Sequence, residues 1–134
     1  MKKSTVAKIK RLGFADMGDH FSLHKNARTV TLTERTLGES VMLEVMVTVK
    51  TRLLTAYEKE TLAKIAVTNR MIRLENINIG EQTSILLSMI LPEEEIVRLG
   101  EYIKSGCKFL DKILKRVDDE KEEIDDKTLV DICS

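Results

Sequence analysis

The chain has 134 residues, of which 43% are hydrophobic and 33% are charged, and its 22 basic residues balance its 22 acidic residues. This composition is typical of one folded domain and excludes a disordered chain, which has too few apolar residues to build a core. No apolar run approaches the roughly 18–20 residues that cross a bilayer. The basic start of the chain is interrupted by charges before a signal-peptide core forms. We therefore expect a cytoplasmic protein with no membrane partner.

The first third of the chain predicts one short helix and two strands. Three aliphatic residues spaced for one helical face precede Gly13, which ends the helix. Apolar and polar residues then alternate in two runs, as in half-buried strands. The elements predicted here are a helix over 5–12, a connector over 14–18, and strands over 19–24 and 28–34 with a turn over 25–27 between them.

Residues 40–51 form the clearest predicted strand, after a turn over 37–39. The odd-numbered positions from Val41 to Val49 are all aliphatic, whereas Met42 and Met46 lie among polar residues at the even positions. Because side chains of a strand alternate between its two faces, this pattern predicts one wholly apolar face and a second, mixed face.

The next segment switches to helical spacing. Thr55 and Glu58 have the spacing of a capping box, which predicts the start of a helix over 55–71. Ala63 and Val67 add apolar surface beside the main apolar stripe of this helix. The combined stripe is wider than a helix needs when it covers only one surface. The elements predicted after it are a strand over 72–79 with a bulge at 75–76, a hairpin turn over 80–82, and a strand over 83–91 that is apolar enough to be covered on both faces.

The chain then predicts one long amphipathic helix. Pro92 suits the first helical position, and the acidic run 93–95 complements the positive end of the helix dipole. The predicted apolar stripe consists of Ile96, Leu99, Gly100, Ile103, Gly106, Cys107, Leu110, Ile113, Leu114 and Val117. We expect residues 1–117 to form a single α+β domain, and 118–134 to be an acidic extension that continues the helix or is partly disordered.

Strands joined by tight turns predict an antiparallel sheet. We therefore expect an α+β fold with a five-stranded antiparallel sheet, the order α-β-β-β-α-β-β-α, and the long C-terminal helix packed on the sheet. This order resembles the type III secretion chaperone-like superfamily, which includes class I secretion chaperones and YbjN-like cytoplasmic proteins.

The resemblance covers residues 4–117. Its most specific part is Asn69 near the end of the middle helix, followed by a hairpin and by Leu91 and Pro92 before an acidic helix start. It implies a homodimer that holds an extended partner chain along its outside. The basic N-terminal third departs from the acidic composition of secretion chaperones.

No motif predicts catalysis. Four residues of strand place His20 and His24 roughly 13 Å apart, too far to share one metal ion. The acidic runs lack the spacing of a calcium loop, the glycines form no phosphate loop, and no serine or cysteine has a recognisable catalytic partner. The two cysteines, Cys107 and Cys133, are too few and too dispersed for a disulfide framework. We expect no enzyme, no metal and no cofactor.

Two functional hypotheses remain. The first is a non-catalytic protein-interaction module, chaperone-like or regulatory, that binds a partner polypeptide as a homodimer, with Met42 and Met46 as partner-binding residues and Ala63 and Val67 at the dimer interface. The second is a nucleic-acid-associated regulator that uses the excess of cations near the N-terminus. Those cations are Lys2, Lys3, Lys8, Lys10, Arg11, Lys25 and Arg28.

Overall fold

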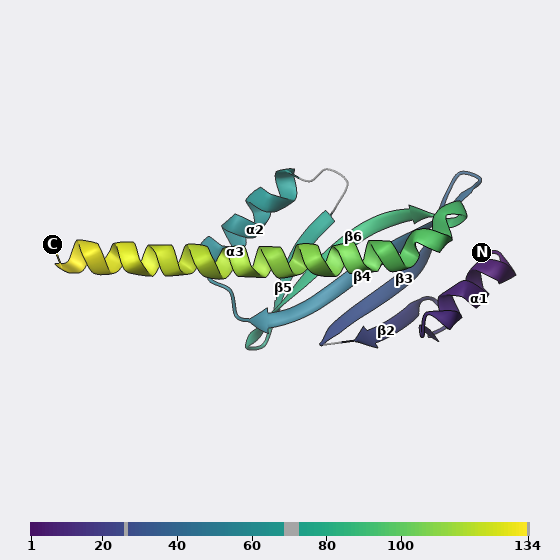
Figure 1. The fold of residues 1–134 in the computed structure, drawn as a ribbon, viewed down its shortest axis with the longest axis horizontal. Helices are drawn as coiled ribbons and strands as arrows, with labels where there is room; N and C mark the ends of the chain where they lie inside the picture. Colours follow the sequence, from purple (N-terminus) through teal and green to yellow (C-terminus); the bar gives the residue numbers. More distant parts are fainter. Residues whose placement is uncertain (26, 69–72, 134) are drawn as a thin grey trace.

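The structure is a computed structural model that describes residues 1–25, 27–68 and 73–133, with the side chains of 65–68 and 117–133 left undescribed. Its elements follow one another along the chain as shown in Figure 1. They are α1 (Lys3–Arg11), β1 (Ala15–Asp16), β2 (Phe21–Lys25), β3 (Arg28–Leu37), β4 (Ser40–Arg52), α2 (Ala56–Thr68), β5 (Arg73–Ile79), β6 (Gln82–Pro92), the 3-10 helix η1 (Glu93–Arg98) and α3 (Leu99–Cys133).

The strands form one antiparallel sheet in the order β1-β2-β3-β4-β6-β5. The long strand β4 lies in the middle, where Val45 pairs with Leu32 of β3 and with Met89 of β6. Directly paired residues of antiparallel strands point to the same face, so this register aligns the aliphatic residues of neighbouring strands. The predicted α+β class, with an antiparallel sheet and a C-terminal helix, is confirmed.

The predicted number of five strands is wrong, because the described chain contains a sixth strand, β1. It falls within the expected connector and pairs Ala15 with Ser22 and Asp16 with Phe21. A strand of two residues is too short to show the alternation on which strand prediction depends. The element order therefore has one more strand than predicted, at the edge of the sheet.

Pro92 does not begin a helix as predicted. Strand β6 continues through it, with Pro92 paired to Met42, and the helical segment starts as the 3-10 helix η1 before α3. A proline at the end of a strand ends the ladder because it has no N–H to donate. The first acid of the run, Glu93, is buried and accepts a 3.0 Å hydrogen bond from the backbone N–H of Lys2, so it also ties α1 to the end of the sheet.

The predicted bulge at Glu75 and Asn76 is also wrong. Both residues pair in continuous register, with Leu86 and Ile85 respectively. The apolar residues of β5 change face along the strand: Leu74 lies on the face that packs against the core, whereas Ile77 lies on the other face. The slip in the sequence pattern thus marks a change in which face is apolar, rather than an extra residue.

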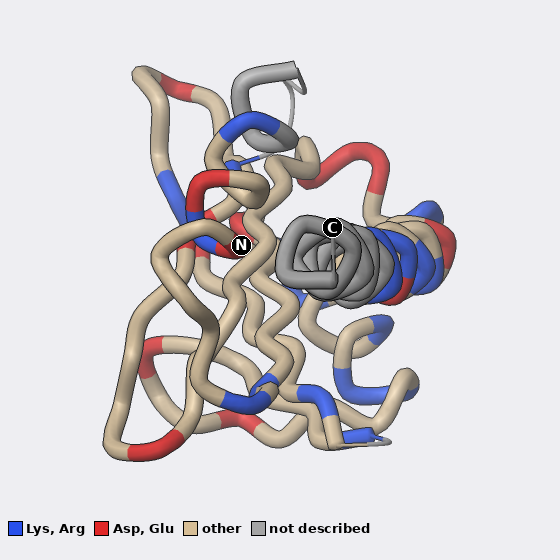
Figure 2. Tube along the Cα trace, turned by 90° about the vertical axis from the view of Figure 1, so that its left-hand side faces the viewer, with Lys and Arg blue, Asp and Glu red and all other residues tan. Residues whose placement is uncertain are grey.

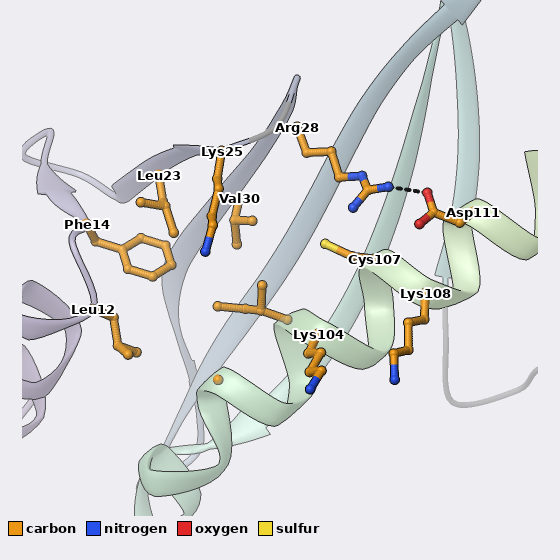
Figure 3. Close-up of a pocket in the computed structure, with 12 residues that line it drawn as sticks. Leu12, Phe14, Leu23, Lys25, Arg28, Val30, Lys104, Cys107, Lys108 and Asp111 are labelled. Atoms are coloured by element: carbon orange, nitrogen blue, oxygen red, sulfur yellow. Dashed lines mark hydrogen bonds and ion pairs between the residues drawn. The ribbon is translucent and has the colours of Figure 1, made fainter.

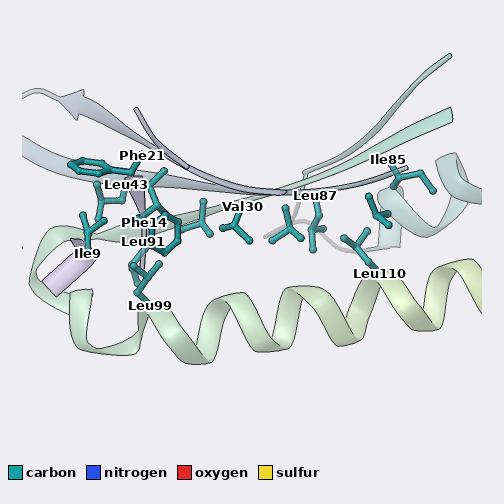
Figure 4. Packing of buried hydrophobic residues seen from close by; sticks show 14 of the residues in the cluster. Ile9, Phe14, Phe21, Val30, Leu43, Ile85, Leu87, Leu91, Leu99 and Leu110 are labelled. Carbon is teal, nitrogen blue, oxygen red and sulfur yellow. The ribbon is translucent and has the colours of Figure 1, made fainter. Parts of the chain in front are cut away.

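The hydrophobic core lies between one face of the sheet and α3 (Figure 4). α1 adds Ile9 to this core and α2 adds Leu62, and both side chains are almost fully buried. Much of the predicted helical stripe is buried here, including Leu99, Gly106, Leu110 and Ile113 of α3, with Ile96 of η1. The remaining stripe residues are the partly buried Ile103, Cys107 and Leu114, the exposed Gly100, and Val117, whose side chain lies outside the described residues.

Gly106 sets the distance between α3 and the sheet. A Cβ atom at this position would lie 2.9 Å from Cε of Met89, 3.3 Å from Cδ2 of Leu87 and 3.5 Å from Cγ2 of Val47. A larger residue at this position therefore requires the end of the Met89 side chain to move and Leu87 to shift slightly.

We expect Gly106→Leu to lower the free energy of unfolding by about 1–3 kcal/mol, since the added side chain overpacks the core. Urea denaturation measures the effect. Gly100→Leu is the matched control, because a Cβ atom at Gly100 meets no atom within 4 Å. The control should be neutral or stabilising, since leucine favours a helix more than glycine does. Equal stability of the two variants would contradict the close approach.

The predicted capping box at the start of α2 is confirmed. The N–H of Glu58 donates to Oγ1 of Thr55 at 3.2 Å, and the N–H of Thr55 donates to Oε1 of Glu58 at 2.9 Å. Glu58 is only 2% exposed and also accepts hydrogen bonds from both terminal nitrogens of Arg52. The Arg52 guanidinium, assisted by the Thr55 N–H, lowers the pKa of Glu58 from 4.5 to about 2.

Because the folded-state pKa of Glu58 is depressed, its stabilising effect is complete above pH 4.5 and is lost as the pH falls towards 2. We expect Glu58→Gln to lower the free energy of unfolding by about 2 kcal/mol at pH 7, since Gln keeps a capping oxygen but not the charge. The difference from wild type should shrink in urea denaturation at about pH 2.5. Glu60→Gln, on an exposed residue of α2, is the control. A difference of the same size at both pH values would show that the charge does not matter.

Candidate functional site

The candidate site is the face of the sheet that points away from α3, which we call the open face. Along β4, Leu43, Val45 and Val47 are fully buried beneath α3, whereas Met42 and Met46 on the open face are only partly buried. Figure 2 shows α3 on one side of the sheet, and the core side chains of Figure 4 all lie between the two. Since α1 and α2 also bury residues in that core, no described helix packs on the open face.

On the half of the open face formed by β4, β6 and β5, apolar side chains alternate with polar ones such as Glu44, Glu75 and Ser84. The register places Met46 beside Ser88, and Leu86 beside Thr48 and Glu75. The three isoleucines on this face are exposed: Ile77 at 48%, Ile79 at 65% and Ile90 at 50%. The apolar residues of this half are Met42, Met46, Ile77, Ile79, Leu86 and Ile90.

The other half of the open face is polar. Strand β3 contributes Thr29, Thr31 and Thr33, and Nε of Arg35 donates to Oε2 of Glu44 at 2.9 Å. The open face thus combines apolar side chains with hydroxyl groups and two ion pairs, Arg35–Glu44 and Arg73–Glu75. Such a surface suits a polypeptide, which presents both apolar side chains and hydrogen-bonding groups.

The free edge of the sheet borders the apolar half. β5 pairs with β6 on one side only, so the backbone groups along its other side have no strand partner among the described residues. Its side chains on the open face are all exposed, whereas Leu74 and Asn76 on the other face are partly buried. An edge strand with exposed isoleucines is a surface on which another chain can dock.

The structure separates the residues predicted for partner binding from those predicted for the dimer interface. Met42 and Met46 lie on the open face, as the strand pattern predicted. Ala63 is exposed on α2, which packs on the opposite side of the sheet, and the side chain of Val67 lies outside the described residues. Leu53 and Tyr57, both about half exposed, add apolar surface at the start of α2.

Sequence reasoning missed the contribution of β5 and β6 to the open face. The apolar run of β6 predicted a strand covered on both faces, but Ile90 is half exposed because described helices pack on only one face. The sequence does contain a sign of this arrangement. Ile77 and Ile79 are spaced two and four residues from Glu75, so all three side chains lie on the same face of β5, opposite the face of Leu74. In the sequence analysis this spacing predicts a bulge instead.

The basic residues do not form one surface. Lys2, Lys3, Lys8, Lys10 and Arg11 lie on or beside α1, and all five are exposed. Lys25 and Arg28 lie at the turn between β2 and β3, where they border a cavity of about 490 Å³ against α3 (Figure 3). We call this cavity the basic cleft.

The basic cleft has an apolar floor and a charged rim. Arg28 and Asp111 form an ion pair across it. Burial disfavours the charge of Arg28, but hydrogen bonding and attraction to Asp111 outweigh that cost, and the pKa of the guanidinium is raised. The apolar lining residues are Leu12, Phe14, Leu23, Val30, Ile103 and Cys107, and the charged ones are Lys25, Arg28, Lys104, Lys108 and Asp111.

The two histidines are not brought together by the fold. Nδ1 of His20 lies 2.6 Å from Oδ1 of Asp19, and this hydrogen bond lowers the pKa of the aspartate. Nδ1 of His24 lies 3.0 Å from Oγ1 of Thr29. Among the residues that the structure describes, no three His, Cys, Asp or Glu side chains are grouped to hold a metal ion.

Comparison of the chain with protein-family models, with curated proteins and with solved structures finds no match. Within the described residues, no helix combines the length and the apolar composition needed to span a bilayer.

Proposed function

We propose that this protein is a non-catalytic, cytoplasmic interaction module that binds a partner polypeptide on the open face and acts as a homodimer. The observation that carries the proposal is the asymmetry of the sheet: described helices cover one face, while the other carries six apolar side chains from β4, β5 and β6, of which three are exposed and three partly buried. Exposed apolar patches rimmed by polar groups mark protein-interaction surfaces.

The dimensions of the open face support a polypeptide partner. Across the sheet, the strands β2, β3, β4, β6 and β5 are spaced about 4.8 Å apart, which gives a width of roughly 20 Å. Along the strands, a rise of about 3.3 Å per residue gives a length of roughly 30 Å. This is of the same order as the ~800 Å² that each partner contributes to a standard interface. Met42 and Met46 add adaptability, because methionine is flexible and polarisable and packs against varied side chains.

A homodimer is supported by a separate surface around α2. Ala63, Leu53 and Tyr57 are exposed there, away from the open face, so dimer formation and partner binding do not compete for the same residues. The predicted element order, to which the structure adds the edge strand β1, is the basis of the resemblance to the type III secretion chaperone-like superfamily. In that superfamily a homodimer holds an extended partner chain, which is what we propose here.

A nucleic-acid-associated regulator is the second candidate, favoured by the cations at the basic cleft. Against it, the two aromatic side chains of the N-terminal region, Phe14 and Phe21, are only 4% and 8% exposed, so neither is free to stack on a base. A shift in the electrophoretic mobility of DNA or RNA that weakens with salt and is lost in Lys25→Gln with Lys108→Gln would favour this candidate.

We expect Met42→Ser combined with Met46→Ser to weaken partner binding at least about tenfold, because both methionines contribute to the apolar half of the open face. The partner is first isolated from the native host with the wild-type protein and identified by mass spectrometry. Its binding segment is then synthesised and titrated calorimetrically against wild type and variant.

The matched control is Met17→Ser, which removes a 58% exposed methionine from the loop before β2 and should leave the affinity unchanged. Urea denaturation should show that all three proteins are similarly stable, since each replaced side chain is at least partly exposed. Equal affinity of wild type and the double variant would exclude the open face as the binding site. Sedimentation at tens of micromolar tests the homodimer separately, and a monomer would contradict it.

A further inference from the structure

The basic cleft lies on the opposite side of the sheet from the open face, and partner binding on the open face does not use it. Strands β2 and β3 form one wall and α3 forms the other, with the end of α1 closing one side through Leu12. Its volume of about 490 Å³ falls within the range of sites that hold small molecules. Residues 100–111 of α3 line it over roughly 16 Å, at 1.5 Å per helical residue.

The floor of the cleft favours an apolar ligand body. Phe14 and Val30 are buried at its base, while Leu23, Ile103 and Cys107 are partly buried and Leu12 is 47% exposed at its edge. No buried side-chain nitrogen or oxygen among the described residues lacks a hydrogen-bond partner, so the floor offers no unmet polar group to a ligand. Contact with hydrocarbon would remove this apolar surface from water.

The rim of the cleft favours a negative head group. Four cations border the cleft against one acid, Asp111, which is held by Arg28. Lys25 on the strand side and Lys104 and Lys108 on the helix side form no ion pair within the described part of the chain. Lys104 and Lys108 are four residues apart on α3 and therefore lie on the same side of the helix. Figure 3 shows these two exposed side chains directed away from the strands, whereas Lys25 points towards the cavity.

We propose that the basic cleft binds a single-chain anionic amphiphile, such as a fatty acid, with its alkyl chain on the apolar floor and its carboxylate among Lys25, Lys104 and Lys108. An extended alkyl chain of roughly a dozen carbons, at ~1.3 Å per bond along its axis, spans the lined stretch of α3. A nucleic acid suits the cleft less well, because its floor offers neither an accessible aromatic ring nor a polar group for a base. An acidic polypeptide is the competing occupant, and the test below separates the two.

The experiment uses the full chain with Cys133→Ser, so that Cys107 in the floor is the single reactive thiol. Sodium laurate is added below its micelle concentration, and the rate of Cys107 alkylation by N-ethylmaleimide is measured together with calorimetric binding. We expect saturable binding of one laurate per chain, a matching decrease in the alkylation rate, and weaker binding at high salt. Dodecyltrimethylammonium, with the same chain length and a positive head group, should neither bind nor protect.

Charge removal provides the matched pair of variants. The double variant Lys104→Gln with Lys108→Gln should weaken laurate binding about tenfold. The control double variant is Lys112→Gln with Lys115→Gln, which changes exposed lysines of α3 that do not line the cleft. The control should leave laurate binding unchanged. Leu12→Gln should also weaken binding without loss of stability, because this side chain is about half exposed. The open-face variant with Met42→Ser and Met46→Ser should bind laurate like wild type, which separates this proposal from the proposed function.

Three results would overturn the proposal. These are no laurate binding, equal binding of laurate and dodecyltrimethylammonium, and equal laurate affinity of the two lysine-pair variants. A synthetic peptide of alternating Glu and Leu is tested in parallel. Protection of Cys107 by this peptide but not by laurate would assign the cleft to an acidic polypeptide instead.

Discussion

The close packing of α3 against one face of the sheet is the contact on which the rest of the structure depends. Gly106 allows the helix to reach Val47, Leu87 and Met89, which lie side by side on β4 and β6. This packing buries the aliphatic face of β4 and provides the surface against which α1 and α2 place Ile9 and Leu62. Because the described helices all pack on that face, the amphipathic pattern of the strands leaves the other face in contact with solvent.

Both surfaces to which we assign binding follow from this one-sided arrangement. The open face exists because described helices cover only one side of the sheet, which leaves Ile90 of β6 half exposed. The basic cleft lies on the covered side of the sheet, where Leu23 of β2 and Cys107 of α3 both line the cavity. Both surfaces combine apolar side chains with polar groups that can select a partner. The two surfaces lie on opposite sides of the sheet.

Much of the fold was predictable because strong local patterns agree with the tertiary structure. The alternation along β4 and the capping box of Thr55 and Glu58 both appear in the structure as the sequence predicts. The two-residue strand β1 could not be predicted, since its pairing depends on the position of β2 and not on its own residues. The sequence also does not reveal which face of β6 is left uncovered, because that depends on where distant helices pack.

The candidate sites were predictable only in part, for the same reason. Met42 and Met46 are distinctive because they are the apolar residues on the otherwise polar face of β4. Ile77, Ile79 and Ile90 join them through strand register, which no local pattern gives. The cleft unites Arg28 with Asp111, which are 83 residues apart in the chain, so no motif spacing could predict it.

The most direct test of this account measures the solvent accessibility of two adjacent residues of β4. In a background with Cys107→Ser and Cys133→Ser, Met46→Cys and Val47→Cys are reacted separately with a thiol reagent, in dilute protein without partner. We expect the thiol at position 46 to react rapidly. The thiol at position 47, beneath α3, should react about a thousandfold more slowly because its reaction requires unfolding. Equal rates at the two positions, whether fast or slow, would contradict a sheet that is covered on one face and open on the other.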